Sequence, residues 1–271
     1  MIESRFVYRG TAVGLGGRIV RIDPKSDLDI LIPVQGASAL PVIGGRSESK
    51  IRSCSLSIRR PVGMTLASAR SVETLAESVV ERKGKPFETW VHVDVRSVRL
   101  LDQISIARVQ LNLKSIHGQG DRFPRISTEG SEITGLKLGR QPITVTLDLK
   151  TFKTADTKES LAATYAKNAS FRKRKAKKFN TPPDSETIQE YSGGFYICSI
   201  VESISGKLPD GAFIDENGYT IVWPGVGKVV LGEMLISENS RRLTMVRVHF
   251  GSPREGDTVV GEGDVNGSSV P

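Results

Sequence analysis

The sequence predicts an all-β fold, an antiparallel β-sandwich that carries one inserted amphipathic basic helix. Apolar residues alternate with polar ones in short runs, as in residues 30–34, 54–58 and 91–95. This period of two is typical of strands with one buried face. Glycine, proline, asparagine and aspartate separate the runs. One long segment departs from this pattern and has the period of a helix. The sandwich topology, jelly-roll or immunoglobulin-like, stays open.

Length and composition limit the classes of protein that fit. The chain of 271 residues is compatible with one or two domains. We expect a single β-rich domain over residues 1–271, in which residues 151–192 form a helix-plus-loop insertion. Charged residues make up 25% and apolar residues 38%, which argues against a disordered chain. Since no apolar run is long enough for a transmembrane helix, no membrane span is predicted.

One long strand-like stretch changes its buried face midway. Ile104 and Ile106 share one parity, whereas Val109 and the apolar residues that follow share the other. A shift of one residue turns every later side chain to the opposite face. We therefore predict a β-bulge near Ala107-Arg108 that restores the buried face.

Two hairpins can be recognised by their turns. Gly139-Arg140 is the predicted turn within residues 136–149, and glycine at the first turn position fits a type II′ turn. Pro142 has no N–H group, so it should lie at an edge or on the non-bonded side of the ladder. The second hairpin covers residues 227–251 and has its turn at Asn239-Ser240. Within this hairpin, too, the apolar residues must change from one face of the strand to the other.

The segment 67–80 fits two structures. Its order between strand-like runs and its content of serine, threonine and valine are typical of a strand. Its periodicity predicts a helix, because five apolar residues follow the i, i+3, i+4, i+7, i+8 spacing: Val72, Leu75, Ala76, Val79 and Val80.

The clearest helix candidate runs from Thr157 to Phe179. Thr157 can cap its first turn, and an apolar stripe that includes Leu161 and Tyr165 follows a period of 3.6. Eight cations and one acidic residue between 157 and 180 give 8 − 1 = +7, out of a net charge of +8 for the chain. The cations are concentrated in one basic run: Arg172, Lys173, Arg174, Lys175, Lys177 and Lys178.

This basic run is the predicted interaction site. Dense cations bind phosphate backbones, serve as localisation signals or dock on an acidic neighbour. The plain alternative is a solvated helix end that complements its own dipole. Few aromatic residues stand among the cations, which is unfavourable for stacking on bases. We therefore expect a homo-oligomer or an assembly partner with an acidic surface, and nucleic acid is the less favoured partner.

Catalytic, metal and cofactor motifs are missing from the sequence. The histidines, His92, His117 and His249, are not at zinc-ligand spacings from one another or from a cysteine. No nucleophile elbow and no phosphate-binding loop is present. We predict no metal and no cofactor. His117, with Asp121 nearby, is the candidate for acid–base work.

The first residues and the cysteines bear on the compartment. MIESRFVYRG lacks the features of a secretory signal, so we expect a cytoplasmic protein. Cys54 and Cys198 lie in strand-like runs with apolar neighbours, which favours free buried thiols. Whether the two pair cannot be decided from their positions in the sequence.

Four motifs follow one another in a characteristic order: TAVGLGGRIV, SVRLLDQISIARVQLNLKSIH, STEGSEITGLKLGRQPITVT and WPGVGKVVLGEMLIS. In this order the chain resembles bacterial β-rich proteins of the choice-of-anchor type, which are uncharacterised surface proteins. Residues 100–103 depart from that pattern because they lack its turn glycine. The resemblance implies an all-β, non-catalytic protein at the cell surface or outside the cell, and a strand in the segment 67–79.

Three functions remain open on these grounds. The first is a non-enzymatic structural or assembly protein that self-associates or packs on a partner through sheet edges and the basic helix, since exposed edges need partners or covering. The second is a binding module for an acidic polymer, nucleic acid or glycan. The third is a hydrolase with a loop-borne site near His117. We favour the first, and neutralising the basic run should then abolish the interaction and leave the fold intact.

Overall fold

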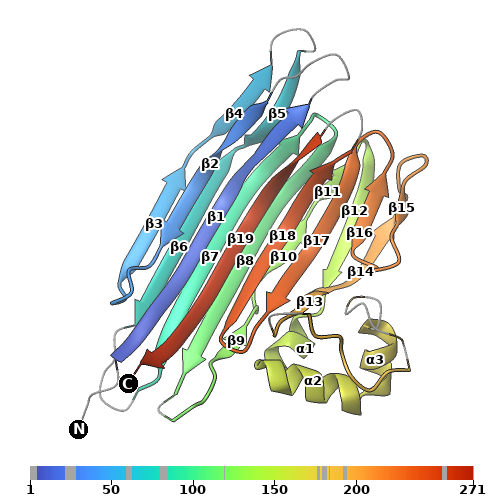
Figure 1. Ribbon diagram of the computed structural model, residues 1–271. Helices are drawn as coiled ribbons and strands as arrows, with labels where there is room; N and C mark the ends of the chain where they lie inside the picture. Colours follow the sequence, from blue (N-terminus) through green and yellow to red (C-terminus); the bar gives the residue numbers. More distant parts are fainter. Residues whose placement is uncertain are drawn as a thin grey trace.

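A computed structural model describes residues 5–21, 29–58, 63–79, 85–118, 120–175, 178, 182, 184–191, 194–251 and 255–270. Two large antiparallel sheets pack face to face, and a small helical part lies below one end of them (Figure 1). The predicted all-β sandwich is confirmed. Its core is formed by the inward side chains of both sheets, as alternation along the strands requires.

Sheet A has the order β15-β16-β17-β18-β19-β1-β2, and β13 pairs with a second stretch of β17. Strands β16 to β19 pair in sequence order, and β19 then pairs with β1, so the two ends of the described chain meet in one sheet. The strands are β1 (Arg5–Arg21), β2 (Ile30–Ala39), β13 (Tyr196–Ser199), β15 (Phe213–Ile214), β16 (Thr220–Trp223), β17 (Gly227–Ile236), β18 (Ser240–Phe250) and β19 (Glu255–Val270).

Sheet B has the order β14-β12-β11-β8-β7-β5-β4, with β6 between β7 and β3, and with β9 and β10 against β8. Its strands are β3 (Arg46–Ile51), β4 (Cys54–Ile58), β5 (Met64–Ala69), β6 (Ser71–Val79), β7 (Phe87–Leu100), β8 (Ile104–His117), β9 (Arg125–Ser127), β10 (Glu132–Thr134), β11 (Leu136–Leu138), β12 (Gln141–Leu147) and β14 (Val201–Gly206).

The segment 67–80 is strand and not helix, as far as it is described. It holds the end of β5 and the whole of β6, which is paired on both sides, with β3 and with β7. Val72 and Ala76 face the core and Leu75 faces outward, the period-two pattern of a strand. Two ladders of backbone hydrogen bonds outweigh the local helical period. Val80 lies outside the described residues.

The predicted change of buried face in β8 is present. Ile106 and Val109 are both buried, and Ala107 between them is exposed. The predicted isolated bulge is wrong, however, because β7 and β8 keep a single register along their whole length. The neighbouring strands change their parity at the same level, so the ladder remains in register.

We call this line of parity changes the sheet B crease. Ser97 of β7 lies opposite Ala107, and Gly135, between β10 and β11, lies opposite Ala107 on the other side. Ser97 and Gly135 have φ values of 53° and 63°, which locally rotate the backbone and move the next side chain to the other face. On the far side of β7 the crease continues at Arg70, the residue between β5 and β6.

Sheet A has a matching crease that consists mainly of glycines. Gly14, with Gly36 and Gly261 opposite it, marks the level at which β1 and β19 change their inward parity. A Cβ atom on Gly14 would lie 2.1 Å from Cγ1 of Val72, which enters from sheet B. Only glycine leaves room for this close approach. Gly14 of VGLGGRIV therefore serves the close approach of the two sheets at this crease.

Both predicted hairpins are present. Gly139 and Arg140 join β11 to β12, and Gly139 has a φ of 60°, as its turn position requires. Pro142 is exposed and precedes the stretch of β12 that pairs with β14. The second turn spans Ser237–Ser240 and has Glu238 and Asn239 at its centre, one residue earlier than the predicted Asn239-Ser240. Leu243 and Val248 are both buried on either side of a change of buried face.

The helical part differs from the predicted helix 157–179. It holds three short helices, α1 (Leu149–Thr154), α2 (Lys158–Lys167) and α3 (Ala169–Lys175). Asn168 separates α2 from α3, and its Oδ1 accepts a bond from the Phe171 N–H at 2.9 Å. Asparagine therefore starts a new helix where periodicity predicts continuation. Thr157 caps α2, as predicted.

Two further expectations can be compared with the described residues. Within these ranges, no helix combines the length and apolar content that crossing a bilayer demands. Cys54 is half-buried on β4 of sheet B, and Cys198 is buried on β13 of sheet A. Both are free thiols.

Candidate interaction surfaces

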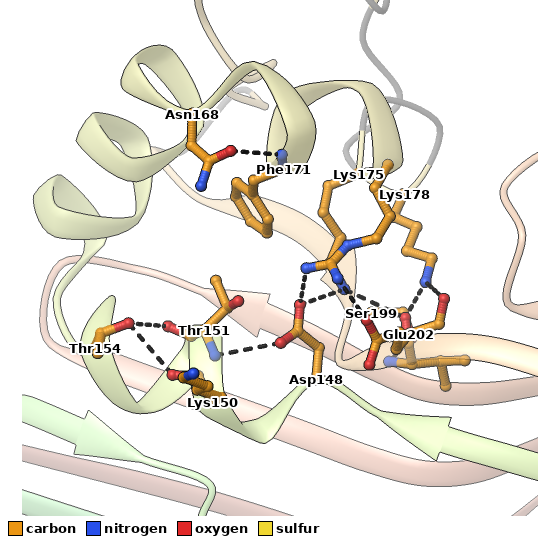
Figure 2. A network of polar contacts seen from close by, with 12 residues as sticks. Asp148, Lys150, Thr151, Thr154, Asn168, Phe171, Lys175, Lys178, Ser199 and Glu202 are labelled. Atoms are coloured by element: carbon orange, nitrogen blue, oxygen red, sulfur yellow. Dashed lines mark hydrogen bonds and ion pairs between the residues drawn. The ribbon is translucent and has the colours of Figure 1, made fainter.

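A buried carboxylate holds the helical part to the sheets (Figure 2). Asp148 follows β12 and caps α1 by accepting a bond from the Thr151 N–H at 3.2 Å. Its other oxygen, Oδ2, lies 2.6 Å from Arg174 Nη2 and 3.2 Å from Lys175 Nζ. One side chain therefore joins the start of α1 to the end of α3. Arg174 also pairs with Glu202 on β14.

Two lysines point from the helical part toward the same strand (Figure 2). Lys178 donates to the carbonyl oxygens of Val201 and Glu202, the latter at 3.1 Å, and Lys175 donates to Val201 O at 3.4 Å. The exposed fractions of Lys175 and Lys178 are 0% and 5%. Buried lysines are rare unless they are paired, so these contacts belong to the packing of the fold.

Burial sets the pKa values in this network. Burial lowers the pKa of Lys178 to about 7, and the charges of Lys175 and Arg174 act in the same direction. Burial also lowers the pKa of Lys175, although Asp148 opposes it. Burial alone would raise the pKa of Asp148, but the charge of Lys175 and the Thr151 bond outweigh it and lower the pKa. The cluster is thus richer in cations than in carboxylates.

The basic run does not form one exposed surface. Arg174, Lys175 and Lys178 face the chain's own carboxylates and carbonyls. Lys173 is exposed, and Arg172 is half-buried and bonds to Ala166 O. The sixth predicted residue, Lys177, lies outside the described residues. The expectation that all six cations meet an external partner is therefore corrected for Lys175 and Lys178, which the fold buries.

The partners of these cations were not identified from the sequence. Asp148 had one usable signal, its position just after a strand and before a helix, which is typical of an N-cap. A further buried cation, Arg241 of β18, could not be recognised as buried from the sequence. It is 1% exposed, and its Nη2 donates to Ala155 O at 3.0 Å, while Nη1 has no bond among the described residues. Burial lowers the pKa of Arg241 to about 10.

His117 belongs to an aromatic cluster at the strand ends. It is 5% exposed, and its ring centre lies 5.3 Å from that of Phe6, which stacks on Phe87 at 4.2 Å. Burial lowers the pKa of His117, and Asp121 opposes the shift. The Asp121 carboxylate accepts a bond from the Gly118 N–H at 2.9 Å. This ring is packed as a core side chain and has little surface for a substrate to reach.

An apolar hollow lies on the outer face of sheet A, between the end of β1 and the starts of β2 and β19. These strand ends are remote from the helices (Figure 1). The hollow has a volume of about 590 Å³, and Gly16 and Gly17 of β1 contribute no side chains to its lining. Three apolar side chains on its rim have large exposed fractions: Leu31 with 67%, Val34 with 57% and Val20 with 42%. Contiguous exposed apolar side chains mark interaction sites more often than isolated ones do.

The hollow adjoins the first half of β2, whereas β3 of sheet B lies beside the second half of this strand. β2 is the last strand of sheet A, with β1 on one side and no described strand paired to the other. The Leu40 N–H donates toward β1, to Gly10 O, and the Ala39 N–H donates outward, to Ser47 Oγ at 3.3 Å. Pro33 in this strand cannot donate a hydrogen bond, as is common on edge strands. The sequence pattern predicts exposed strand edges but does not indicate that β2 is one of them.

Comparison with known proteins gives one match. A family model described as a domain of unknown function, DUF8256, matches residues 6–237. No curated protein and no solved structure matches the chain significantly. Nothing in these comparisons bears on the choice-of-anchor proteins, so that resemblance stays a prediction. Because the family model covers well over half of the sequence, the chain belongs to the DUF8256 family, whose function is unknown.

Proposed function

We propose that this protein is a non-enzymatic structural subunit that associates with a second copy of itself through the apolar hollow. The observation that carries the proposal is the exposure of Leu31 and Val34, 67% and 57%, beside a floor of glycines. Moving such side chains out of water stabilises an association by roughly 25 cal/mol per Å² of apolar surface. Chains that do not use such a patch seldom keep it exposed.

The charges around the hollow favour a second copy as the partner. Its lining carries one cation and one anion, Arg18 and Asp257, so two copies would not repel each other there. Both charges already have partners in the chain, since Arg18 pairs with Asp29 and Asp257 with His249. A two-fold contact brings a patch against itself and therefore requires self-complementarity. An apolar patch with balanced charges meets this requirement.

The sheet edge supports the same arrangement. β2 borders the hollow and keeps one side without a paired strand among the described elements. Unpaired edges tend to associate with other chains unless they are covered. A partner seated over Leu31 and Val34 would cover the first half of this edge together with the hollow, and β3 already lies beside the second half.

Light scattering coupled to size exclusion, over a wide range of protein concentration, tests the proposal. The unaltered chain should form a dimer or larger assembly, and Leu31→Asp with Val34→Asp should leave a monomer. Val79→Asp is the matched control, because Val79 is 54% exposed on sheet B and should not affect the assembly. Circular dichroism verifies that each variant is folded. A monomer at every concentration, or an equal effect of the control, would reject the proposal.

A further inference from the structure

A second concave site lies on the outer face of sheet A, next to the segment that leaves the helical part and enters β13. It has a volume of about 360 Å³, which is in the range of small-molecule sites. Phe195, Ile197 and Leu235 form an apolar wall. The opposite wall consists of polar and charged side chains from β17 and β18. This pocket does not overlap the apolar hollow.

The first polar group of the pocket is a carboxylate held in place. Arg247 Nη1 lies 2.8 Å from Glu233 Oε1, and Arg247 Nη2 lies 3.3 Å from Thr244 Oγ1. Thr244 Oγ1 in turn donates to Glu262 Oε2 at 3.0 Å. These contacts fix the Glu233 side chain across three strands. A carboxylate accepts several hydrogen bonds, so Glu233 retains acceptor capacity toward the pocket.

The second polar group is a guanidinium that is available for a ligand. Arg242 is half exposed, and its nearest carboxylate oxygen, Asp264 Oδ2, is 3.8 Å away. That separation exceeds a hydrogen bond, so the Arg242 side chain has no hydrogen-bond partner among the described residues. Leu235 is paired with Arg242 and Glu233 with Thr244. Arg242 and Glu233 are therefore diagonal neighbours, at about 7–8 Å on a regular sheet.

The pocket thus presents a positively charged hydrogen-bond donor, a negatively charged hydrogen-bond acceptor and an apolar wall. We propose that it binds a free α-amino acid with an apolar side chain, the carboxylate on Arg242, the ammonium on Glu233 and the side chain against Phe195 and Leu235. A zwitterion fits because it adds no net charge to a site where arginines and carboxylates are already mixed. Arg binds carboxylates through its planar set of donors.

Isothermal titration with L-phenylalanine and L-leucine, on the full chain, tests the proposal. L-phenylalanine or L-leucine should bind. N-acetyl-L-phenylalanine lacks the ammonium and phenethylamine lacks the carboxylate, and each should bind at least about tenfold more weakly than L-phenylalanine, since a hydrogen bond to a charged group is lost. Failure of both amino acids to bind, or equal binding of the three phenyl compounds, would overturn the proposal.

Variants locate the binding. Arg242→Gln should lower the affinity for L-phenylalanine by at least about tenfold. It should leave the weak binding of phenethylamine unchanged, because phenethylamine has no carboxylate. Arg46→Gln is the control, since the side chain of Arg46 has a similar exposed fraction and lies on sheet B, away from the pocket. If Arg46→Gln weakens L-phenylalanine as much as Arg242→Gln does, the ligand binds elsewhere. Thermal unfolding of both variants ensures that the comparison is made between folded proteins.

Discussion

The helical end of the sandwich and the β2 side of sheet A differ in how their surfaces are covered. At the helical end, Asp148 and the buried lysines join α1 and α3 to β14 through charges taken out of water. At the β2 side, Leu31 and Val34 stay exposed on the edge strand of sheet A. Three cations of the basic run, Arg174, Lys175 and Lys178, thus contact groups of the chain itself, whereas two apolar side chains of β2 are left exposed to solvent.

The largest effect is expected from breaking the charged end. Asp148→Ala removes the carboxylate that pairs with Arg174 and Lys175 and leaves the buried Lys175 without an ion-pair partner, so it should lower the free energy of unfolding by about 3–5 kcal/mol. Urea denaturation measures this change. Glu202→Ala is the control, because Glu202 bonds the same arginine but is 37% exposed, and it should cost about 1 kcal/mol or less. If both variants lowered the free energy of unfolding equally, burial would not determine how much these ion pairs stabilise the helical end.

The next effect separates the inner and outer faces of β1, the strand that pairs with β2. Gly14→Ala places a methyl group 2.1 Å from Val72 Cγ1 and should lower the free energy of unfolding by about 1–3 kcal/mol. For Gly16→Ala the nearest atom to the added methyl group is Cγ2 of Val34, at 3.2 Å, and this side chain is exposed and can move aside. This substitution should change the stability by less than about 1 kcal/mol. The reverse order of the two variants would contradict the proposed role of the crease.

A pH titration tests the buried lysines. The pKa of Lys178 is about 7 in the folded chain and about 10.4 in an unfolded one. Between these values the unfolded chain binds more protons, so the free energy of unfolding should rise with pH, by about 1–2 kcal/mol from about pH 7 to 8.5. Lys178→Met should flatten this rise. Part of the rise should persist in this variant, because the pKa of Lys175 is also lowered and its effect on the free energy of unfolding has the same sign.

The control for that titration is Lys173→Met, since Lys173 is exposed and the rise should persist in this variant. The window ends near pH 8.5 because burial raises the pKa of Cys198 to about 12. Above the ordinary thiol pKa, the unfolded chain loses a proton that the folded chain keeps, and this lowers the stability. A profile that is flat from about pH 7 to 8.5 in the unaltered chain would count against a buried Lys178.

The smallest effect on stability is expected at the apolar hollow. Leu31→Asp should change the free energy of unfolding of the monomer by no more than about 0.5 kcal/mol, because the side chain is already exposed. Denaturation at low protein concentration measures it apart from association. Leu15→Ala, at a buried position of the adjacent strand, should instead cost about 2–5 kcal/mol. A large loss for Leu31→Asp would place this side chain in the fold and remove the basis of the proposed assembly.

Local patterns predicted well wherever the structure depends on nearby residues. The turn at Gly139-Arg140 and the cap at Thr157 are present as predicted, because turn geometry and capping involve residues within a few positions. The break at Asn168 was missed, although asparagine is a common cap, because the apolar period on both sides suggested one continuous helix. The change of face in β8 was detected from parity. The sequence did not show that this change is a crease and not a bulge, because a crease shared by several strands is recognised only when the pairing of those strands is known.

The sequence by itself determined the class of fold, the strand-rich layers, the position of the helical part and the concentration of positive charge there. These follow from period, turn chemistry and composition, which act over short distances along the chain. The tertiary structure decided that segment 67–79 is strand, that the buried face changes along one crease in each sheet, and that Lys175 and Lys178 are buried against Val201. It also decided which apolar side chains stay exposed. These outcomes depend on strands far apart in sequence that pack together, and no local pattern encodes that packing.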